Sequence, residues 1–471
     1  MKKDFLAKHF DGMGGINALL PIAVPMIFAN VFETAITVID RLFLSYTGKA
    51  QMAACMNGGL TAWTCMTLFI GIVSYVSAMV ARSYGAGKKG ECVSITYQGI
   101  YFALLSYPLI LLIGYFASNS FVWAGHDALE VQNERIYFWY LIFGDGLFVV
   151  LRMALSSFFS GIGKTRVILR IHAMMMVLNL SFNYIFIFGK LGCPALGIHG
   201  AAIGRLLASL LATGAFFFVF IKYSRKKEYA NSKAMHFNRH MIRPLLRFGV
   251  PNGLDNMLST SAFTVAISSL HGFGTNAAAA LTVIMNWDLC AYLPMLGIQI
   301  GIITLVSQCL GVGNKKEAER AVFSGLKLNL CYLAVLLTLF LGIPRILVGL
   351  FTPGSRVIDY SEVVTLAIPM LRSAAFYLFF EGIYISFRGA LRGGGGTLWA
   401  MIVGIAFHWL MAGVLLVSIH VIKWPMLNCW YTWVAASVVG TAVMYLRFKT
   451  GKWKCFDILE NHKTKQKAVR A

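Results

Sequence analysis

The sequence predicts an all-α polytopic membrane protein, with twelve transmembrane helices in two pseudo-symmetric six-helix bundles. Its composition, its apolar stretches and an internal repeat lead to this prediction. Of 471 residues, 58% are hydrophobic and 13% are charged, whereas a soluble domain carries roughly 25% charged residues. Most of the molecular surface is therefore expected to face lipid.

Twelve largely apolar stretches are each long enough for a spanning helix, which needs ~20 residues. The first stretch follows Lys2, Lys3 and Lys8 and is too long for the core of a cleavable signal. We expect it to remain as a membrane helix. The nine cysteines are scattered and contain no CxxC pair, so neither a disulfide framework nor a zinc site is predicted.

The formal net charge of +22 would be typical of a nucleic-acid-binding protein if the chain were soluble. Here the basic residues lie between the apolar stretches. Counted loop by loop, 30 of the 41 Lys and Arg residues fall on one side of the predicted membrane and 6 on the other. Arg388 and Arg392 are counted there as residues of a loop. The positive-inside rule then predicts that both termini are cytoplasmic, at a cell inner membrane or plasma membrane.

The second half of the sequence repeats the first. Pro25 in "IAVPMI" lies 226 residues before Pro251 in "FGVPNG", and Gly85 lies 226 residues before Gly311. An even number of helices separates the copies, which predicts two lobes in the same orientation about an axis along the membrane normal. The predicted parts are an N-lobe at 1–221, a cytoplasmic linker at 222–244, a C-lobe at 245–446 and a basic cytoplasmic tail at 447–471. The linker is interpreted as a solvated connector.

Several short motifs occur in order within this frame: "VIDRLFLSYTG", "SGIGKTR", "NLSFNYIFIFG", "LGIHGAAIG" and "GALRGGGGT". With them the chain resembles the MATE (multidrug and toxic compound extrusion) family over about residues 15–450. In "SGIGKT", a phosphate-binding loop would need glycine where this chain has Phe158. The motif is therefore interpreted as a turn rather than as an ATP site.

The resemblance implies a secondary active exporter, an antiporter rather than an enzyme. It would move organic, cationic or amphiphilic compounds out of the cell in exchange for H+ or Na+, by alternating access of two lobes. The expected partners are a small-molecule substrate and membrane lipid, without nucleic acid, and no cofactor besides the coupling ion. A monomer is expected. Two alternatives are a flippase for a lipid-linked oligosaccharide or peptidoglycan precursor, and a non-transporting membrane receptor or scaffold.

Asp40 is the first candidate for cation coupling. A carboxylate inside an apolar helix costs ~2.5–3.5 kcal/mol to insert, so it should face the protein interior. The resemblance implies a coupling role for this position. The alternative is a structural ion pair, although neighbouring Arg41 points about 100° away. Glu33, two helical turns earlier, is expected on the same face, as a second polar group of the substrate cavity or as a structural hydrogen-bonding residue.

Asn179 and Asn183 are four residues apart and should share one helix face. Many bacterial MATE proteins have aspartate at the position of Asn183. Amide oxygens can ligate a cation, so a Na+ site near Asp40, Asn179 and Asn183 is predicted, with helix packing as the alternative role of the amides.

In the second half, the resemblance implies a coupling role for Glu381 and a place in the substrate cavity for Tyr377, one turn earlier. The usual partner acid falls at Ser259 in this chain. Asp255 or Asp288 would have to substitute for it, and a structural role is the alternative for both. Asp145 and Arg152 are predicted to form an intramembrane pair or network. His172 and His408 are interpreted as core histidines, although both could titrate near neutral pH.

Overall fold

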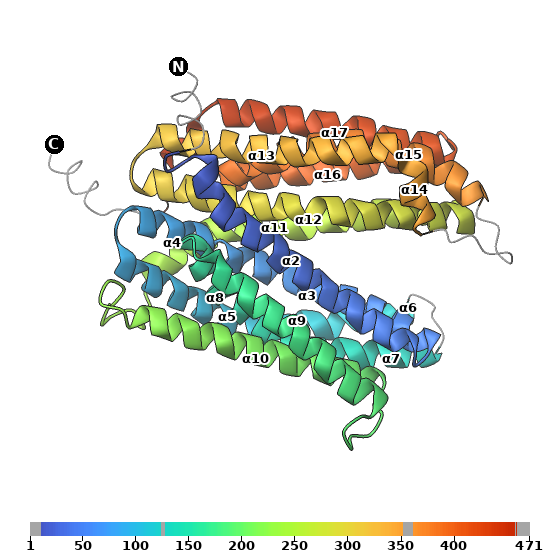
Figure 1. Ribbon diagram of the computed structural model, residues 1–471, viewed down its shortest axis with the longest axis horizontal. Helices are drawn as coiled ribbons and strands as arrows, with labels where there is room; N and C mark the ends of the chain where they lie inside the picture. Colours follow the sequence, from blue (N-terminus) through green and yellow to red (C-terminus); the bar gives the residue numbers. More distant parts are fainter. Residues whose placement is uncertain (1–10, 124–127, 352–360, 457, 459–471) are drawn as a thin grey trace. The chain divides into compact units, whose positions relative to one another are not determined.

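The computed structural model describes residues 11–123, 128–351, 361–456 and 458 (Figure 1). Within these ranges the chain is helical and contains no strand. Lys2, Lys3, Lys8 and the predicted tail from residue 459 onward lie outside the described residues.

The helices follow one another with short connections. In chain order they are α2 (Ile16–Ser45), α3 (Lys49–Ser74), α4 (Val76–Gly85), α5 (Lys89–Ala117), α6 (Ser120–Trp123), α7 (Ala128–Trp139), the π-helix η1 (Tyr140–Asp145), α8 (Gly146–Gly161), α9 (Thr165–Phe188), α10 (Ile198–Ser224), α11 (Arg239–His271), α12 (Thr275–Gly311), α13 (Lys315–Gly342), α14 (Pro344–Gly349), α15 (Ser361–Gly394), α16 (Thr397–His420), α17 (Met426–Lys449) and the 3₁₀-helix η2 (Lys452–Cys455).

Eleven helical spans in the described residues are long and apolar enough to cross a membrane. One joins α4 to most of α3, and one joins most of α7 to η1 and α8. Helix α11 has 33 residues and is also long enough, but its membrane-length part carries Asn252, Asp255 and Asn256. The all-α polytopic class is confirmed, and the predicted number of twelve helices is consistent with eleven apolar spans plus α11.

Packing divides the chain into two compact units. The N-terminal unit contains Phe28–Gly253 and Gly311–Gly313, and the C-terminal unit contains the residues up to Ile27, Leu254–Leu310 and Asn314–Phe456. The division falls inside α2 and α11, because the first part of α2 packs with the C-terminal unit. In that unit Gly301 leaves room for the side chain of Leu19, and Gly325 leaves room for that of Ile302. The lobe boundaries given above stay a prediction.

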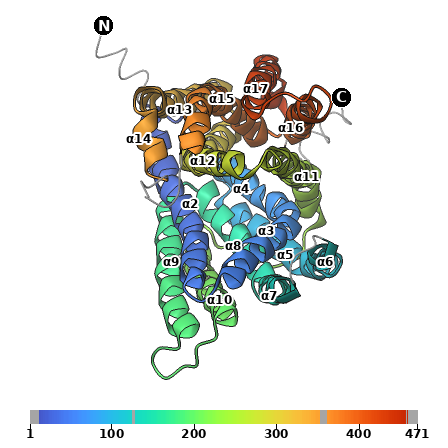
Figure 2. The same ribbon diagram turned by 90° about the vertical axis from the view of Figure 1, so that its right-hand side faces the viewer.

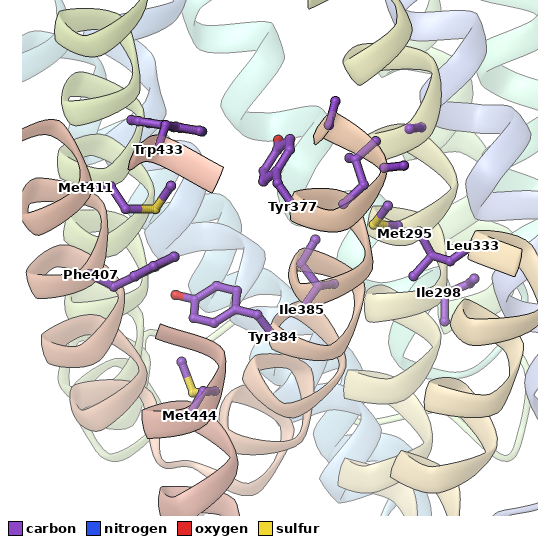
Figure 3. Close-up of a cluster of buried hydrophobic side chains, with 14 of the residues drawn as sticks. Met295, Ile298, Leu333, Tyr377, Tyr384, Ile385, Phe407, Met411, Trp433 and Met444 are labelled. Atoms are coloured by element: carbon purple, nitrogen blue, oxygen red, sulfur yellow. The ribbon is translucent and has the colours of Figure 1, made fainter. Parts of the chain in front are cut away.

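Helix α15 is central to the C-terminal unit, where it packs against α13 and α17 (Figures 1 and 2). Figure 3 shows Tyr377 and Tyr384 extending from it, with the hydroxyl end of Tyr384 directed toward Phe407 of α16. Buried side chains from α12, α13, α16 and α17 surround this face. This packing fixes the position of the α15 side chains that face the core of the unit.

In the N-terminal unit, α10 packs along α9 (Figure 2), and α8 packs against α4 and α5. The residues of the predicted linker are mostly exposed, as expected for a connector, yet they are tied to α5. Gln98 donates to the carbonyl of His236 at 3.0 Å and accepts from the amide of Asn238 at 3.0 Å. These bonds satisfy backbone groups that a free connector would leave to water.

Candidate functional site

Asp40 is fully buried in the N-terminal unit and is surrounded by hydrogen-bond donors. Asn183 Nδ2 donates to Asp40 Oδ1 at 2.6 Å and also to Asn179 Oδ1 at 3.3 Å. Tyr137 Oη donates to Asp40 Oδ2 at 3.3 Å. The structure thus brings the predicted trio of Asp40, Asn179 and Asn183 together, because α2 and α9 present these residues at the same depth.

Arg205 on α10 is the basic partner of Asp40, with Nη1 3.2 Å from Oδ2. Its Nε also lies 3.7 Å from Asp145 Oδ2, so one guanidinium links two carboxylates. Arg205 was not predicted as a partner of Asp40; Arg41 was the basic residue considered for that role. The available signal was a basic residue inside an apolar stretch, which requires an acidic partner in lipid.

A second part of the same network runs through Ser209 on α10. Arg152 Nη1 donates to Ser209 Oγ at 2.6 Å, and Ser209 Oγ donates to Asp145 Oδ1. The predicted network of Asp145 and Arg152 is therefore present, with the hydroxyl between them. Arg152 Nη2 and His172 Nδ1 each lie 3.6 Å from Glu33, whose side chain is 40% exposed. Glu33 is the exposed end of a chain of charges that begins at buried Asp40.

The C-terminal unit holds a tighter ion-pair cluster around Asp255 of α11. Arg388 donates from Nε at 3.1 Å and from Nη2 at 2.7 Å to Asp255 Oδ2, and Arg392 Nη2 donates to the same oxygen at 2.8 Å. Ser259 Oγ donates to Oδ1 at 3.2 Å. Arg392 also reaches Asn256 Oδ1 at 2.9 Å.

This cluster corrects the assignment of Arg388 and Arg392 to a loop. Both side chains are buried, because α15 continues to Gly394. The apolar stretch predicted from the sequence ends at Arg388, but the helix goes on to Gly394, since Asp255 compensates the charges of both arginines. The arginines thus hold Asp255 in an ion pair through Oδ2, and Ser259 donates to Oδ1.

Gly404 on α16 makes room for the cluster. A Cβ atom at this position would lie well inside van der Waals contact of Asp255 Oδ1 and 3.2 Å from Tyr384 Oη. His408, one turn later, has Nδ1 2.7 Å from the carbonyl oxygen of Gly404. Its interpretation as a core histidine agrees with this bond.

Asp288 and Glu381 form the other acidic position of the C-terminal unit. Tyr377 Oη donates to Asp288 Oδ1 at 2.6 Å, and Glu381 lies one turn after Tyr377 on α15. Glu381 is buried and lies within electrostatic range of both Arg388 and Asp288. In the described part of the chain, no Lys or Arg nitrogen lies within 4.0 Å of either carboxylate.

Metal-binding clusters of the usual kind are not found in the described residues, where no group of three His, Cys, Asp or Glu side chains could hold a metal ion. The predicted Na+ site would depend on one carboxylate, Asp40, and on amide oxygens. The functional groups of both units are therefore ion-paired or protonatable side chains within helices.

Helical spans of membrane length that enclose buried charged networks define a multi-pass membrane protein, and such networks are typical of substrate and ion pathways. A model of the MatE family matches residues 25–185 and 251–415. The chain belongs to this family. The two matched segments begin 226 residues apart, which is the offset of the internal repeat.

The similar proteins of known or assigned activity are transporters. A "Probable multidrug resistance protein NorM" of Thermotoga maritima is 22% identical over 450 residues, or 95% of both chains. The protein of the same name from Rhizobium meliloti is 28% identical over 408 residues, covering 83% of this chain and 84% of its own. A solved structure described as "Outward-facing conformation of a multidrug resistance MATE family transporter of the MOP superfamily" has a TM-score of 0.82 at 20% identity, covering 94% and 97%. It shows the same fold.

Proposed function

We propose that the chain exports organic cationic or amphiphilic compounds in exchange for H+ or Na+, and that Glu381 and Asp288 exchange the coupling ion. The observation that carries this proposal is the contrast among the carboxylates of the C-terminal unit. Asp255 shares its charge with two arginines, whereas neither Asp288 nor Glu381 has a basic side chain within ion-pair distance in the described residues. An acid without a built-in counter-charge can take a cation from solution.

The energetics of a membrane interior support this role. An uncompensated charge in a low-dielectric interior costs several kcal/mol, and a bound proton or Na+ removes much of that cost. Transport needs this binding to be stronger in one conformation than in the other, because only the difference shifts the equilibrium between them. We propose alternating access of the two lobes as that pair of conformations. Asp40, with Asn179 and Asn183, stays a predicted second coupling position.

The substrate class follows from the chemistry around these acids and from the relatives. The NorM proteins are named for multidrug resistance. In this chain, Tyr377 and Tyr384 place aromatic rings on the helix that carries Glu381, and aromatic faces attract cations. Glu33, Tyr377 and Asp288 are the proposed substrate-facing groups. For Asp255 and Ser259 we propose that they hold Arg388 and Arg392 in place.

The transport assay uses purified full-length protein in lipid vesicles loaded with a fluorescent organic cation, with pH and Na+ gradients imposed separately. Glu381→Gln and Asp288→Asn are each expected to lower gradient-driven transport by at least about tenfold, equal to 1.4 kcal/mol of lost coupling. Glu362→Gln is the matched control, because Glu362 is an exposed acid on the same helix. Transport at the unmodified rate in both site variants would sink the proposal.

The same vesicles test the remaining parts of the proposal. A labelled lipid-linked precursor should not cross, since the named relatives favour export over the flippase alternative. We also propose a monomer in an inner or plasma membrane with both termini cytoplasmic. Accessibility labelling of single cysteines in the 222–244 linker and in the tail should place both on the cytoplasmic side.

A further inference from the structure

We propose that Arg205 is a resident cation of the N-terminal unit and determines its ion selectivity: it takes the place at Asp40 that Na+ would need, so that this unit responds to protons alone. The inference rests on the proposed function, since it assigns the coupling ion of one unit. It is carried by the donors around Asp40 and by the two carboxylates that Arg205 contacts.

Each of the three hydrogen-bond partners of Asp40 in the described residues presents a hydrogen to it. Tyr137 presents its hydroxyl and Arg205 its guanidinium, both to Oδ2. Asn183 presents its amide NH₂ to Oδ1 at 2.6 Å. A Na+ ion would need oxygen lone pairs directed at these positions instead, and the guanidinium of Arg205 and the amide NH₂ of Asn183 have none to offer.

The orientation of the Asn183 amide follows from its two acceptors. Its Nδ2 lies between Asp40 Oδ1 and Asn179 Oδ1, so the NH₂ group donates to both. Rotating the amide would bring two oxygens within 2.6 Å of each other, which requires a cation or a proton between them. Its Oδ1 instead faces α10, where a Cβ on Gly204 would come within 2.6 Å. An aspartate at this position would have supplied the missing acceptor.

Arg205 can keep its place while Asp40 gains a proton. Its side chain is 20% exposed, and its Nε lies 3.7 Å from Asp145. When a proton neutralises Asp40, the guanidinium retains an ion pair with Asp145 and is not left as an unpaired buried charge. A sodium ion could bind Oδ2 of Asp40 only after the guanidinium had left, and Oδ1 only after the Asn183 amide had turned away. The arrangement therefore admits a proton and excludes a larger cation.

Sodium binding to the purified protein tests this assignment without any transport step. Equilibrium dialysis with radioactive Na+ is carried out in the Glu381→Gln and Asp288→Asn background, which removes the proposed site of the C-terminal unit. This background is expected to bind no Na+ above the level of empty detergent micelles. Adding Arg205→Gln together with Asn183→Asp should raise the Na+ affinity by at least about tenfold. That gain should disappear when Asp40→Asn is added.

Arg152→Gln is the matched control, because Arg152 is a buried arginine of the same unit that contacts Glu33 and Ser209 rather than Asp40. It should produce no Na+ binding. Size-exclusion chromatography reports whether each variant folds. If the Arg205 variant does not fold, Na+ binding is compared between the background protein and the background protein that also carries Asp40→Asn. The two should bind equally little Na+.

Two outcomes overturn the assignment: Na+ binding in the background that Asp40→Asn abolishes, or a folded Arg205→Gln, Asn183→Asp variant without any gain. Both are independent of efflux. A failure of the proposed function would instead be seen as undiminished transport by the Glu381 and Asp288 variants.

Discussion

The two units contain the same kinds of charged residue inside their helices but distribute the countercharges differently. In the network of the N-terminal unit, Arg152 and Arg205 are spread over three carboxylates, and each of these three lies within 4.0 Å of a guanidinium. Arg205 serves Asp40 and Asp145, and Arg152 serves Glu33. Three carboxylates against two guanidiniums leave an excess of one negative charge. This excess is shared along a connected network.

In the C-terminal unit Arg388 and Arg392 both contact a single acid, Asp255. The countercharge is concentrated there. Among the described residues, Asp288 accepts a hydrogen bond from Tyr377, and no Lys or Arg nitrogen lies within 4.0 Å of the carboxylate of Asp288 or Glu381. Three carboxylates against two guanidiniums again leave an excess of one negative charge. Here that excess lies on Asp288 and Glu381. A duplicated helical frame can thus carry two different electrostatic designs, since the frame fixes helix positions and not the residues that compensate each charge.

The largest effect expected from this difference is on stability. Asp255→Ala should lower the free energy of unfolding by about 3–5 kcal/mol, because it leaves two buried guanidiniums without their partner. Asp288→Ala should cost only about 1 kcal/mol, since it removes one hydrogen bond. Thermal unfolding in detergent measures both. If both variants lost the same free energy of unfolding, the distinction between an acid paired with two arginines and an acid without an ion pair would be wrong.

A smaller effect tests how closely the Asp255 cluster is packed. Gly404→Ala should cost about 1–3 kcal/mol, because its Cβ would collide with Asp255 Oδ1 and approach Tyr384 Oη. Gly413→Ala on the same helix is the control, since a Cβ there has no neighbour within 4 Å. The comparison uses the same unfolding measurement. A Gly404 variant as stable as the control would mean that the cluster can move aside.

A glycine of the other unit that also lies against a site residue is Gly204, beside Asn183. Gly204→Ala should cost about 1–2 kcal/mol, somewhat less than Gly404→Ala, because the nearest atom is an amide oxygen with no partner of its own. Gly214→Ala, with open space at its Cβ, is the control on α10. A cost above that at Gly404 would show that the Asn183 amide is held more rigidly than the Asp255 carboxylate.

Much of the fold could be predicted because a membrane demands long apolar helices, and hydropathy reports them directly. The π-helix Tyr140–Asp145 and the short helix Pro344–Gly349 were not predicted, since both depend on local backbone geometry. The end of α15 was misplaced for an energetic reason. Apolar windows stop at Arg388, whereas the helix continues because a distant acid compensates that charge.

The candidate site was predictable where residues lie on one helix or match a motif. Asn179 and Asn183 share a face by their spacing of four, and Asp40 was placed beside them by the family resemblance. Arg205 was missed because its partner is 165 residues away in sequence. A single sequence gives the need for a countercharge within the membrane but not the helix that provides it.

The smallest effect distinguishes the two serines that contact a buried acid. Ser209 receives a hydrogen bond from Arg152 and donates one to Asp145, so Ser209→Ala breaks two contacts and leaves a charged group at each end. It should cost about 1–2 kcal/mol. Ser259→Ala removes one 3.2 Å bond to an acid that two arginines still hold, and should cost under about 1 kcal/mol. Thermal unfolding of the two variants side by side measures the difference. If Ser259→Ala were the costlier change, Asp255 would depend on its serine as well as on its arginines. The two arginines alone would then not account for the stability of the Asp255 cluster, and the contrast with the N-terminal network would be wrong.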